Sequence, residues 1–140
     1  MSISKEKIIE ELNKDLEWEY AAAIQYVQHA AVITGPEYDS IISELLIHSQ
    51  EEMAHAVMLS DQISFLGGTP TINVEERKIA ADSKEMLKQD LWGEEIAIKR
   101  YKERIAQAEA LQEYGLRRVL EDILIQEEEH KRDLLTVLGR

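Results

Sequence analysis

Glutamate and histidine side chains recur in this sequence at positions where an amphipathic helix would place apolar residues. Glu52 precedes His55 by three residues, and Glu127 precedes His130 by the same spacing. Residues three apart lie one turn apart on one helix face, so each pair can direct a carboxylate and an imidazole at the same point. Oxygen donors with one imidazole per metal suit iron or manganese better than zinc or copper. The two pairs therefore predict a site for divalent metal ions.

Two further glutamates, Glu19 and Glu94, interrupt apolar stripes elsewhere in the chain. An unpaired carboxylate in a protein core costs several kcal/mol, and four that converge cannot all stay ionised without cations. Four ionised glutamates carry as much negative charge as two divalent cations carry positive charge. This match predicts a dinuclear metal centre. A bundle whose polar core is satisfied by hydrogen bonds alone is the alternative interpretation.

The same pattern occurs twice in the sequence, with an offset of 75 residues (from 19 to 94). The four members of the first set recur in the second: Glu19, Tyr26, Glu52 and His55 correspond to Glu94, Tyr101, Glu127 and His130. Two helical hairpins that carry one pattern predict a composite site at the centre of a bundle. Tyr26 and Tyr101 can hydrogen-bond a metal ligand or donate an electron, and ordinary core packing with a bonded hydroxyl is the alternative.

Four helices are expected to position these residues. Ser4 can cap a first helix that ends before Gly35 and Pro36, and a second helix covers about 37–66. A third begins after residue 82 or 83 and reaches about 112, and a fourth covers 116–138. Their apolar stripes advance in three- and four-residue steps, and no strand signal is present. In the first and third helices these stripes include Ile9 and Ile105. The pattern predicts an all-α four-helix bundle.

The connection between the second and third helices is long enough to cross the bundle. Its about 16 residues, 67–82, reach roughly 50 Å when extended, whereas a 30-residue helix is about 45 Å long. The other two connections are short and join antiparallel neighbours. We therefore expect a ferritin-like four-helix bundle with one long crossover between helices two and three, formed as a single domain over residues 1–140.

Composition excludes several classes of function. The 140 residues include no Cys, which excludes disulfides, thiolate metal sites and thiol catalysis. A net charge of −12 with no basic patch argues against nucleic-acid binding. No apolar run reaches the roughly 20 residues that span a bilayer, and the N-terminus lacks the layout of a signal peptide. We therefore expect a cytoplasmic protein with no membrane partner.

The sequence resembles bacterioferritin over nearly the whole chain. "LNKDLEWEYAAAIQYVQHA" is similar to its first helix, "EEMAHAVMLSDQISFLGGTP" to its second, "DLWGEEIAI" to its third and "EDILIQEEEH" to its fourth. The resemblance implies a ferroxidase that binds two irons per subunit and oxidises Fe(II) with O2 or H2O2, in iron storage or detoxification. It also implies that Glu52 and Glu127 bridge the two irons. The full set of implied ligands is Glu19, Glu52, His55, Glu94, Glu127 and His130.

The resemblance also bears on haem and on assembly. Met53 directly follows Glu52, so it points about 100° away from the centre, toward solvent or a neighbouring subunit. A Met at this place in bacterioferritin binds haem between two subunits, although Met is also a common interface residue. The sequence ends at "LLTVLGR", without the fifth helix of 24-subunit cages. The resemblance therefore favours a 12-subunit cage built from dimers, or a dimer alone.

The sequence leaves the roles of the remaining polar residues near the motifs open. His48 lies one turn before Glu52 on the same stripe, where it can serve as an extra metal ligand, an access-route residue or a hydrogen-bonded core histidine. His29, Glu51 and Glu128 are expected at the surface or at an interface.

Two other functions remain open from the sequence. One is a di-iron peroxidase similar to rubrerythrin, although that family adds a glutamate where this sequence has Ala97. The other is a helical oligomerisation module without redox function. Metal content and oxidation kinetics distinguish these from a ferroxidase.

Overall fold

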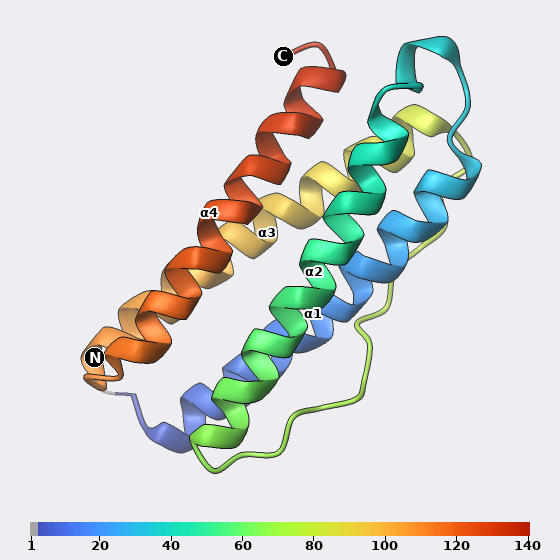
Figure 1. The fold of residues 1–140 in the computed structure, drawn as a ribbon. Coiled ribbons are helices and arrows are strands. Elements are labelled where there is room, and N and C mark those ends of the chain that lie inside the picture. The colour runs from blue at the N-terminus through green and yellow to red at the C-terminus, as the bar shows by residue number, and fades with distance from the viewer. Residues whose placement is uncertain (1–2) are drawn as a thin grey trace.

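Four long α-helices form the bundle in the computed structural model, which describes residues 3–140 (Figure 1). α1 spans Lys5–Val32, α2 Ile41–Phe65, α3 Ser83–Ala110 and α4 Tyr114–Val137. α1 is antiparallel to α2, and α3 is antiparallel to α4. There is no strand within residues 3–140, so the all-α prediction is confirmed. Over the same residues, no helix is long and apolar enough to cross a membrane.

The crossover between α2 and α3 runs along the length of the bundle, which makes these two helices parallel (Figure 1). It is attached to α1 by hydrogen bonds. The backbone N–H of Thr71 donates to Asn13 Oδ1 at 2.8 Å, and its hydroxyl donates to Glu17 Oε2 at 3.0 Å. Further along, the backbone N–H of Glu75 donates to the Glu17 carbonyl at 3.2 Å. The predicted ferritin-like bundle with one long crossover is therefore confirmed.

Local sequence sets the beginnings of α1 and α3. The Ser4 side chain accepts a hydrogen bond from the backbone N–H of Lys7, as the predicted N-cap requires. Asp82 caps α3 in the same way, accepting from the N–H of Glu85. The prediction that the second helix begins near residue 37 is wrong by four residues. Pro36–Tyr38 forms a separate 3-10 turn, η1, and α2 begins only at residue 41.

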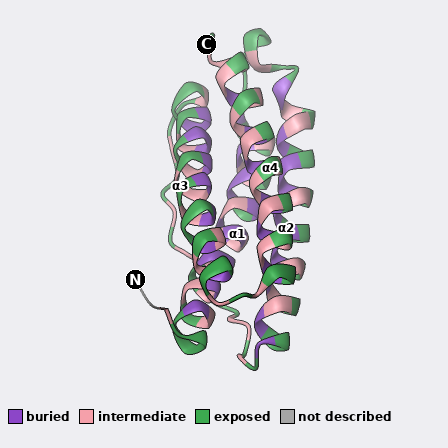
Figure 2. Cartoon of the chain, turned by 90° about the vertical axis from the view of Figure 1, so that its left-hand side faces the viewer, coloured by how far each residue is buried: buried purple, intermediate pink, exposed green. Residues whose placement is uncertain are grey.

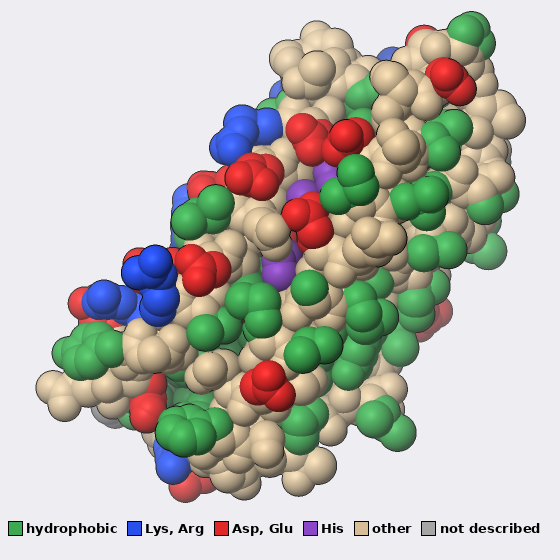
Figure 3. Space-filling model, in the orientation of Figure 1, with side chains coloured by type: hydrophobic (Ala, Val, Ile, Leu, Met, Phe, Trp, Pro, Cys, Tyr) green, Lys and Arg blue, Asp and Glu red, His purple; other side chains and the backbone are tan. Residues whose placement is uncertain are grey.

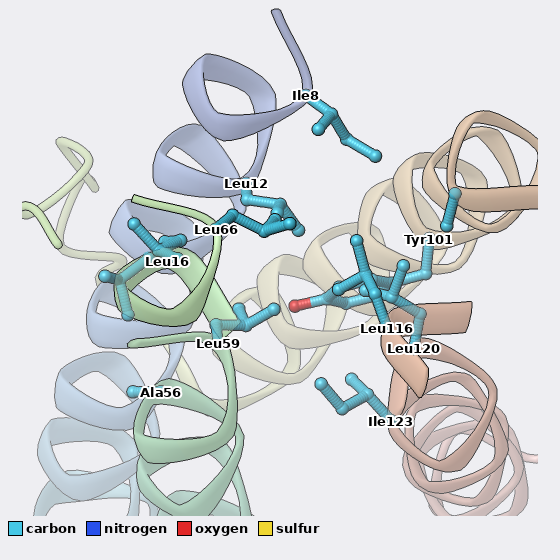
Figure 4. Packing of buried hydrophobic residues seen from close by; sticks show 12 residues of the cluster. Ile8, Leu12, Leu16, Ala56, Leu59, Leu66, Tyr101, Leu116, Leu120 and Ile123 are labelled. Atoms are coloured by element: carbon cyan, nitrogen blue, oxygen red, sulfur yellow. The ribbon is translucent and has the colours of Figure 1, made fainter. Parts of the chain in front are cut away.

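The buried faces of the helices point at one another, and exposed residues lie on the outside (Figure 2). Two apolar clusters fill the two ends of the bundle. One contains Leu12, Leu59 and Leu120, which face each other in Figure 4, and the other contains Leu45 and Leu134. The middle of the bundle lies between them and carries the polar residues.

In parts of α1 and α3 the buried residue is the neighbour of the one that the predicted stripe contains. In α1, Ile8 is buried and Ile9 is only partly buried. In α3, Arg104 is buried where Ile105 was expected. The reason for the second difference is an ion pair, because Arg104 has a partner on α1.

A buried ion pair joins α1 to α3. Arg104 donates from Nε to Asp15 Oδ2 at 2.7 Å and from Nη2 to Asp15 Oδ1 at 3.1 Å, and Arg100 Nε donates to Asp15 Oδ1 at 2.8 Å. Burial raises the pKa of the Asp15 carboxyl even though the two guanidinium groups oppose this shift. This cluster fixes the register of the two helices one turn below Glu19.

We expect Asp15→Ala to lower the free energy of unfolding by about 3–5 kcal/mol, because it leaves Arg104 buried without its charged partner. Urea denaturation followed by far-UV circular dichroism measures this change. Glu109→Ala removes an exposed carboxylate that pairs with Arg117, so it should cost less than about 1 kcal/mol. Equal small losses in both variants would contradict a structural role for the buried pair.

Candidate metal centre

Each of the four helices contributes one glutamate to the middle of the bundle. Glu19 comes from α1, Glu52 from α2, Glu94 from α3 and Glu127 from α4, and the exposed fraction of each is 2% or less. His55 on α2 and His130 on α4 lie beside them and are equally buried. The structure thus brings together all six residues that the sequence predicts as ligands.

The six residues form two overlapping groups. In the first group, ligand atoms of Glu19, Glu52, His55 and Glu127 all lie within 4.8 Å of one another. The second group consists of Glu52, Glu94, Glu127 and His130, whose ligand atoms lie equally close together. It shares two members with the first group. The shared members are the two glutamates on α2 and α4. Two adjacent ions that share two carboxylates would require this arrangement.

The inner nitrogens of both histidines face several carboxylates at once. His130 Nδ1 lies 3.2 Å from Glu94 Oε2, 3.2 Å from Glu127 Oε1 and 3.3 Å from Glu52 Oε1. His55 Nδ1 lies 3.4 Å from Glu52 Oε1 and 3.6 Å from Glu127 Oε1. One N–H can donate to only one of these oxygens at a time, so protein donors alone do not satisfy the group.

Several buried atoms of the centre have no hydrogen-bond partner within residues 3–140. They are one oxygen each of Glu19, Glu52 and Glu94, both oxygens of Glu127, and Nδ1 of His55. Unpaired charged atoms in a protein interior are costly unless a cation lies among them. The oxygen-rich donor set therefore fits divalent ions of the iron or manganese type.

The outer nitrogens of the two histidines are held by a network on the α2/α4 side. His55 Nε2 lies 2.5 Å from Gln126 Oε1, and His130 Nε2 lies 3.0 Å from Glu51 Oε1. Gln126 Nε2 donates to Glu51 Oε2 at 2.9 Å and closes the network. Both oxygens can only accept, so each Nε2 must carry the proton. In the neutral ring this leaves Nδ1 with its lone pair toward the centre, the form that binds metal.

Glu51 is partly exposed, in keeping with the expected surface position, but that expectation did not include its contact with His130. Its side chain is partly buried and it orients His130 across the α2/α4 contact. Gln126 was missed by the sequence reasoning. The repeat contained the signal, because the 75-residue offset pairs Glu51 with Gln126.

The two tyrosines cross between the repeats. Tyr101 on α3 donates its hydroxyl proton to Glu19 Oε1 on α1 at 2.5 Å, and Tyr26 on α1 donates to Glu94 Oε2 on α3. Burial, with the adjacent carboxylates, raises the pKa of both phenols well above its ordinary value. Both hydroxyls therefore stay protonated and hold the two glutamates that lie at the ends of the centre.

A second pair of contacts repeats with the same offset. His29 Nδ1 lies 2.8 Å from Asp90 Oδ2, at the positions that correspond to Arg104 and Asp15. The prediction of His29 at the surface is wrong, because its exposed fraction is 1%. Burial raises the pKa of Asp90 to about 6 although His29 opposes this shift. The sequence reasoning missed both aspartates, and only the 75-residue offset marked them.

Comparison with known proteins identifies the fold family. The family profile described as "Ferritin-like domain" matches residues 9–140. The chain belongs to the ferritin-like family. It is 33% identical over 140 residues to a bacterioferritin of Brucella melitensis, covering 95% of this chain and 87% of that protein. It is 32% identical over 126 residues to a bacterial ferritin of Synechocystis sp., covering 89% of this chain and 81% of that one.

A solved structure agrees over almost every residue of this ferritin-like chain. It is a crystal structure described as ferritin-like, diiron-carboxylate proteins from Bacillus anthracis strain Ames. The TM-score is 0.93 at 36% sequence identity, over 99% of this chain and 100% of that chain. The predicted resemblance to bacterioferritin and its relatives is thus confirmed.

One side of the ferritin-like centre has a pocket between α1 and α3, and the guanidinium group of an arginine lies in it. The pocket is lined by Trp18, Arg77 and Gly93 and reaches Glu19 and Glu94. Arg77 comes from the crossover, and its guanidinium lies 5.0 Å from the Trp18 ring centroid. A Cβ on Gly93 would lie 3.2 Å from Arg77 Nη1, so the glycine gives the guanidinium room. This side therefore places a guanidinium beside the acidic residues that line the pocket, among them Asp90.

Protons partly neutralise the centre in the absence of metal. Burial, together with the neighbouring carboxylates, raises the pKa of Glu52 and Glu127 well above its ordinary value. Burial alone would lower the pKa of His55, but the carboxylates, Glu19 above all, raise it to about 9. The carboxylates also raise the pKa of His130. Metal ions that bind here therefore have to displace protons.

We expect Glu127→Gln to stabilise the metal-free protein by about 1–2 kcal/mol, because glutamine is neutral without taking up the proton that burial otherwise imposes on this carboxyl group. The same variant should lose the stabilisation that a saturating divalent metal gives the unaltered protein, about 2.7 kcal/mol at a concentration 100 times the Kd. Thermal unfolding with and without Co(II) measures both effects.

Glu129→Gln is the matched control, because it removes one carboxylate from the exposed side of the same helix. It should leave both the metal-free stability and the response to Co(II) unchanged. An equal response to Co(II) in Glu127→Gln and in the control would show that the metal binds elsewhere.

Proposed function

We propose that this ferritin-like protein is a ferroxidase. In this proposal the centre binds two Fe(II) ions per chain and oxidises them with O2 or H2O2, in iron storage or detoxification. The observation that carries the proposal is the convergence of six buried ligand residues, five of which have an inner atom with no hydrogen-bond partner within residues 3–140. Membership of the ferritin-like family, with a diiron-carboxylate protein among its structural neighbours, supports iron as the metal.

The proposed ligands divide into end groups and bridges. Glu19 and His55 would hold one ion, and Glu94 and His130 the other. Glu52 and Glu127, which belong to both groups, would bridge the two ions. The tyrosine hydroxyls would fix the orientation of Glu19 and Glu94 and keep one lone pair of each carboxylate directed at the metal. Carboxylate oxygens also favour Fe(III) over Fe(II), which assists oxidation.

The proposed reaction balances with either oxidant. Two Fe(II) ions give up one electron each, and O2 takes both electrons with two protons to form H2O2. With H2O2 as oxidant, the same two electrons and two protons yield two water molecules. The chain would contribute by holding the two ions side by side, so that both electrons leave together, and by excluding bulk water from the buried site.

We expect Glu127→Ala and His130→Ala to lose rapid Fe(II) oxidation, with at least about a tenfold lower rate, because each removes a metal ligand. Stopped-flow absorbance of Fe(III) formation, with O2 consumption measured in parallel, tests this. Circular dichroism should show that the helices remain. Glu129→Gln is the control and should oxidise Fe(II) at the unaltered rate. Unchanged kinetics in both alanine variants would refute the site assignment.

The same experiment separates the alternatives. Fast reduction of H2O2 without retention of Fe(III) would indicate a peroxidase similar to rubrerythrin, although Ala97 occupies the position where that family adds a glutamate. Absence of metal binding would indicate a helical oligomerisation module.

We also propose that the chain assembles through the outer face of α1 and α2. Large apolar side chains are exposed there: Ile24, Val27, Met53 and Val57. Hydrophobic side chains also gather along α2 in the space-filling view (Figure 3). Burial of such a face between two copies is favourable. We propose a dimer, assembled further into a 12-subunit rather than a 24-subunit cage, of a single-domain cytoplasmic protein that binds neither nucleic acid nor membrane.

Haem binding at Met53 belongs to this dimer proposal. The Met53 side chain is 45% exposed and lies on the outer face of α2, so a thioether from each copy can reach a haem between them. We expect protein produced with ample haem to show a Soret band that Met53→Leu removes, because leucine fills similar space without a sulfur ligand. Met58→Leu, on the same helix but packed against the core, should keep the band. No Soret band in the unaltered protein would refute haem binding.

A further inference from the structure

His48 occupies the wall between the centre and the solvent on the α2/α4 side. Its exposed fraction is 1%, and its ring stacks on His130 with the centroids 4.0 Å apart. Nε2 lies 3.0 Å from Asp133 Oδ2, on a side chain that is 45% exposed. Nδ1 is buried and has no hydrogen-bond partner within residues 3–140. The ring is thus bonded to a solvent-accessible carboxylate at one nitrogen, while its other nitrogen is unsatisfied.

His48 belongs to two groups that have the geometry of metal sites. The outer group is Glu44, His48 and Asp133, whose ligand atoms lie within 4.8 Å of one another and whose carboxylates are exposed. The inner group is His48, Glu94 and His130, which has the same spacing and is fully buried. Among residues 3–140, Glu94 Oε1, like His48 Nδ1, is buried without a hydrogen-bond partner. One side chain therefore links a solvent-accessible group to two proposed ligands of the centre.

The internal repeat does not account for His48. The corresponding position, 75 residues later, holds Ile123, which is buried in the apolar core. The two halves of the centre need no histidine at this place, since each already has its own. An apolar residue would also avoid the unpaired Nδ1. The presence of His48 on only one side indicates a role outside the symmetric centre.

Charge distinguishes the two sides of the centre. Glu44, Glu51 and Asp133 lie on the α2/α4 side, and Figure 3 shows carboxylates around the histidines that are visible between these helices. On the α1/α3 side, Arg77 and Arg100 line the pocket together with Asp15 and Asp90, and Arg100 is paired with Asp15. The exposed carboxylates of the first side attract a divalent cation, whereas guanidinium groups offset the carboxylates of the second side.

We propose that Glu44, His48 and Asp133 form an uptake site for divalent cations, through which Fe(II) reaches the centre. The exposed carboxylates bind the ion first, and His48 then transfers it to Glu94 and His130 by exchange of ligands, without a redox step. The inference rests on the proposed function of the centre, and it assigns the side from which the metal arrives.

Uptake of Co(II), followed by stopped-flow visible absorbance, tests this inference without Fe(II) oxidation as the readout. We expect Asp133→Asn and His48→Leu to slow uptake by about tenfold or more, because each removes one part of the route. Equilibrium dialysis at saturation should still find the Co(II) ions that the centre holds, since its ligands are intact. Asp133 is exposed, so its variant keeps the fold even if His48→Leu does not.

Asp122→Asn is the matched control, because it removes the same charge from an exposed position on α4 away from the opening. It should take up Co(II) at the unaltered rate. Unaltered uptake in Asp133→Asn would overturn the inference while the proposed function stands. If the unaltered protein does not bind Co(II), or if Glu127→Gln binds it equally well, the proposed centre is rejected, and the inference with it.

Discussion

Burial of four carboxylates at one point is the constraint on which the rest of this structure depends. Four like charges in the middle of a bundle repel one another and lose their hydration, so the metal-free fold must tolerate a strongly unfavourable core. Two apolar clusters, one at each end of the bundle, hold the helices together on either side. Raised pKa values let protons reduce the repulsion, for example at Glu52 and at His55. The same burial gives the centre its capacity to bind cations.

An approximate two-fold repeat organises the support of this centre. Tyr26 and Tyr101 each cross to the glutamate of the other repeat, and a buried aspartate on each side bonds a cationic or imidazole partner. Hydrogen bonds that cross between the halves make the position of every ligand depend on both hairpins. The helices therefore have to be docked correctly before the ligands converge, which links the shape of the site to the global fold.

The departures from symmetry give the centre two different sides. In the repeat, His48 corresponds to Ile123 and Glu51 to Gln126. The α2/α4 side carries the carboxylates of Glu44, Glu51 and Asp133. The α1/α3 side carries Arg77, which the asymmetric crossover supplies. A symmetric centre has no preferred direction of approach, whereas a charge difference across it provides one. In this protein the repeat thus accounts for the proposed ligands, and its exceptions distinguish the two sides of the centre.

The sequence by itself determined the four helices, the crossover and the six residues that converge, because all of these follow from helical periodicity, capping residues and loop length. It did not determine the roles of His29, Glu51 and Asp90. Their partners lie on other helices, and a burial pattern along one helix does not reveal which polar group will meet it. Tertiary structure also decided that Arg104 rather than Ile105 faces inward, since the ion pair with Asp15 exists only when α1 and α3 are docked. Local sequence fixes which face of a helix is buried, but only packing decides which polar groups meet there.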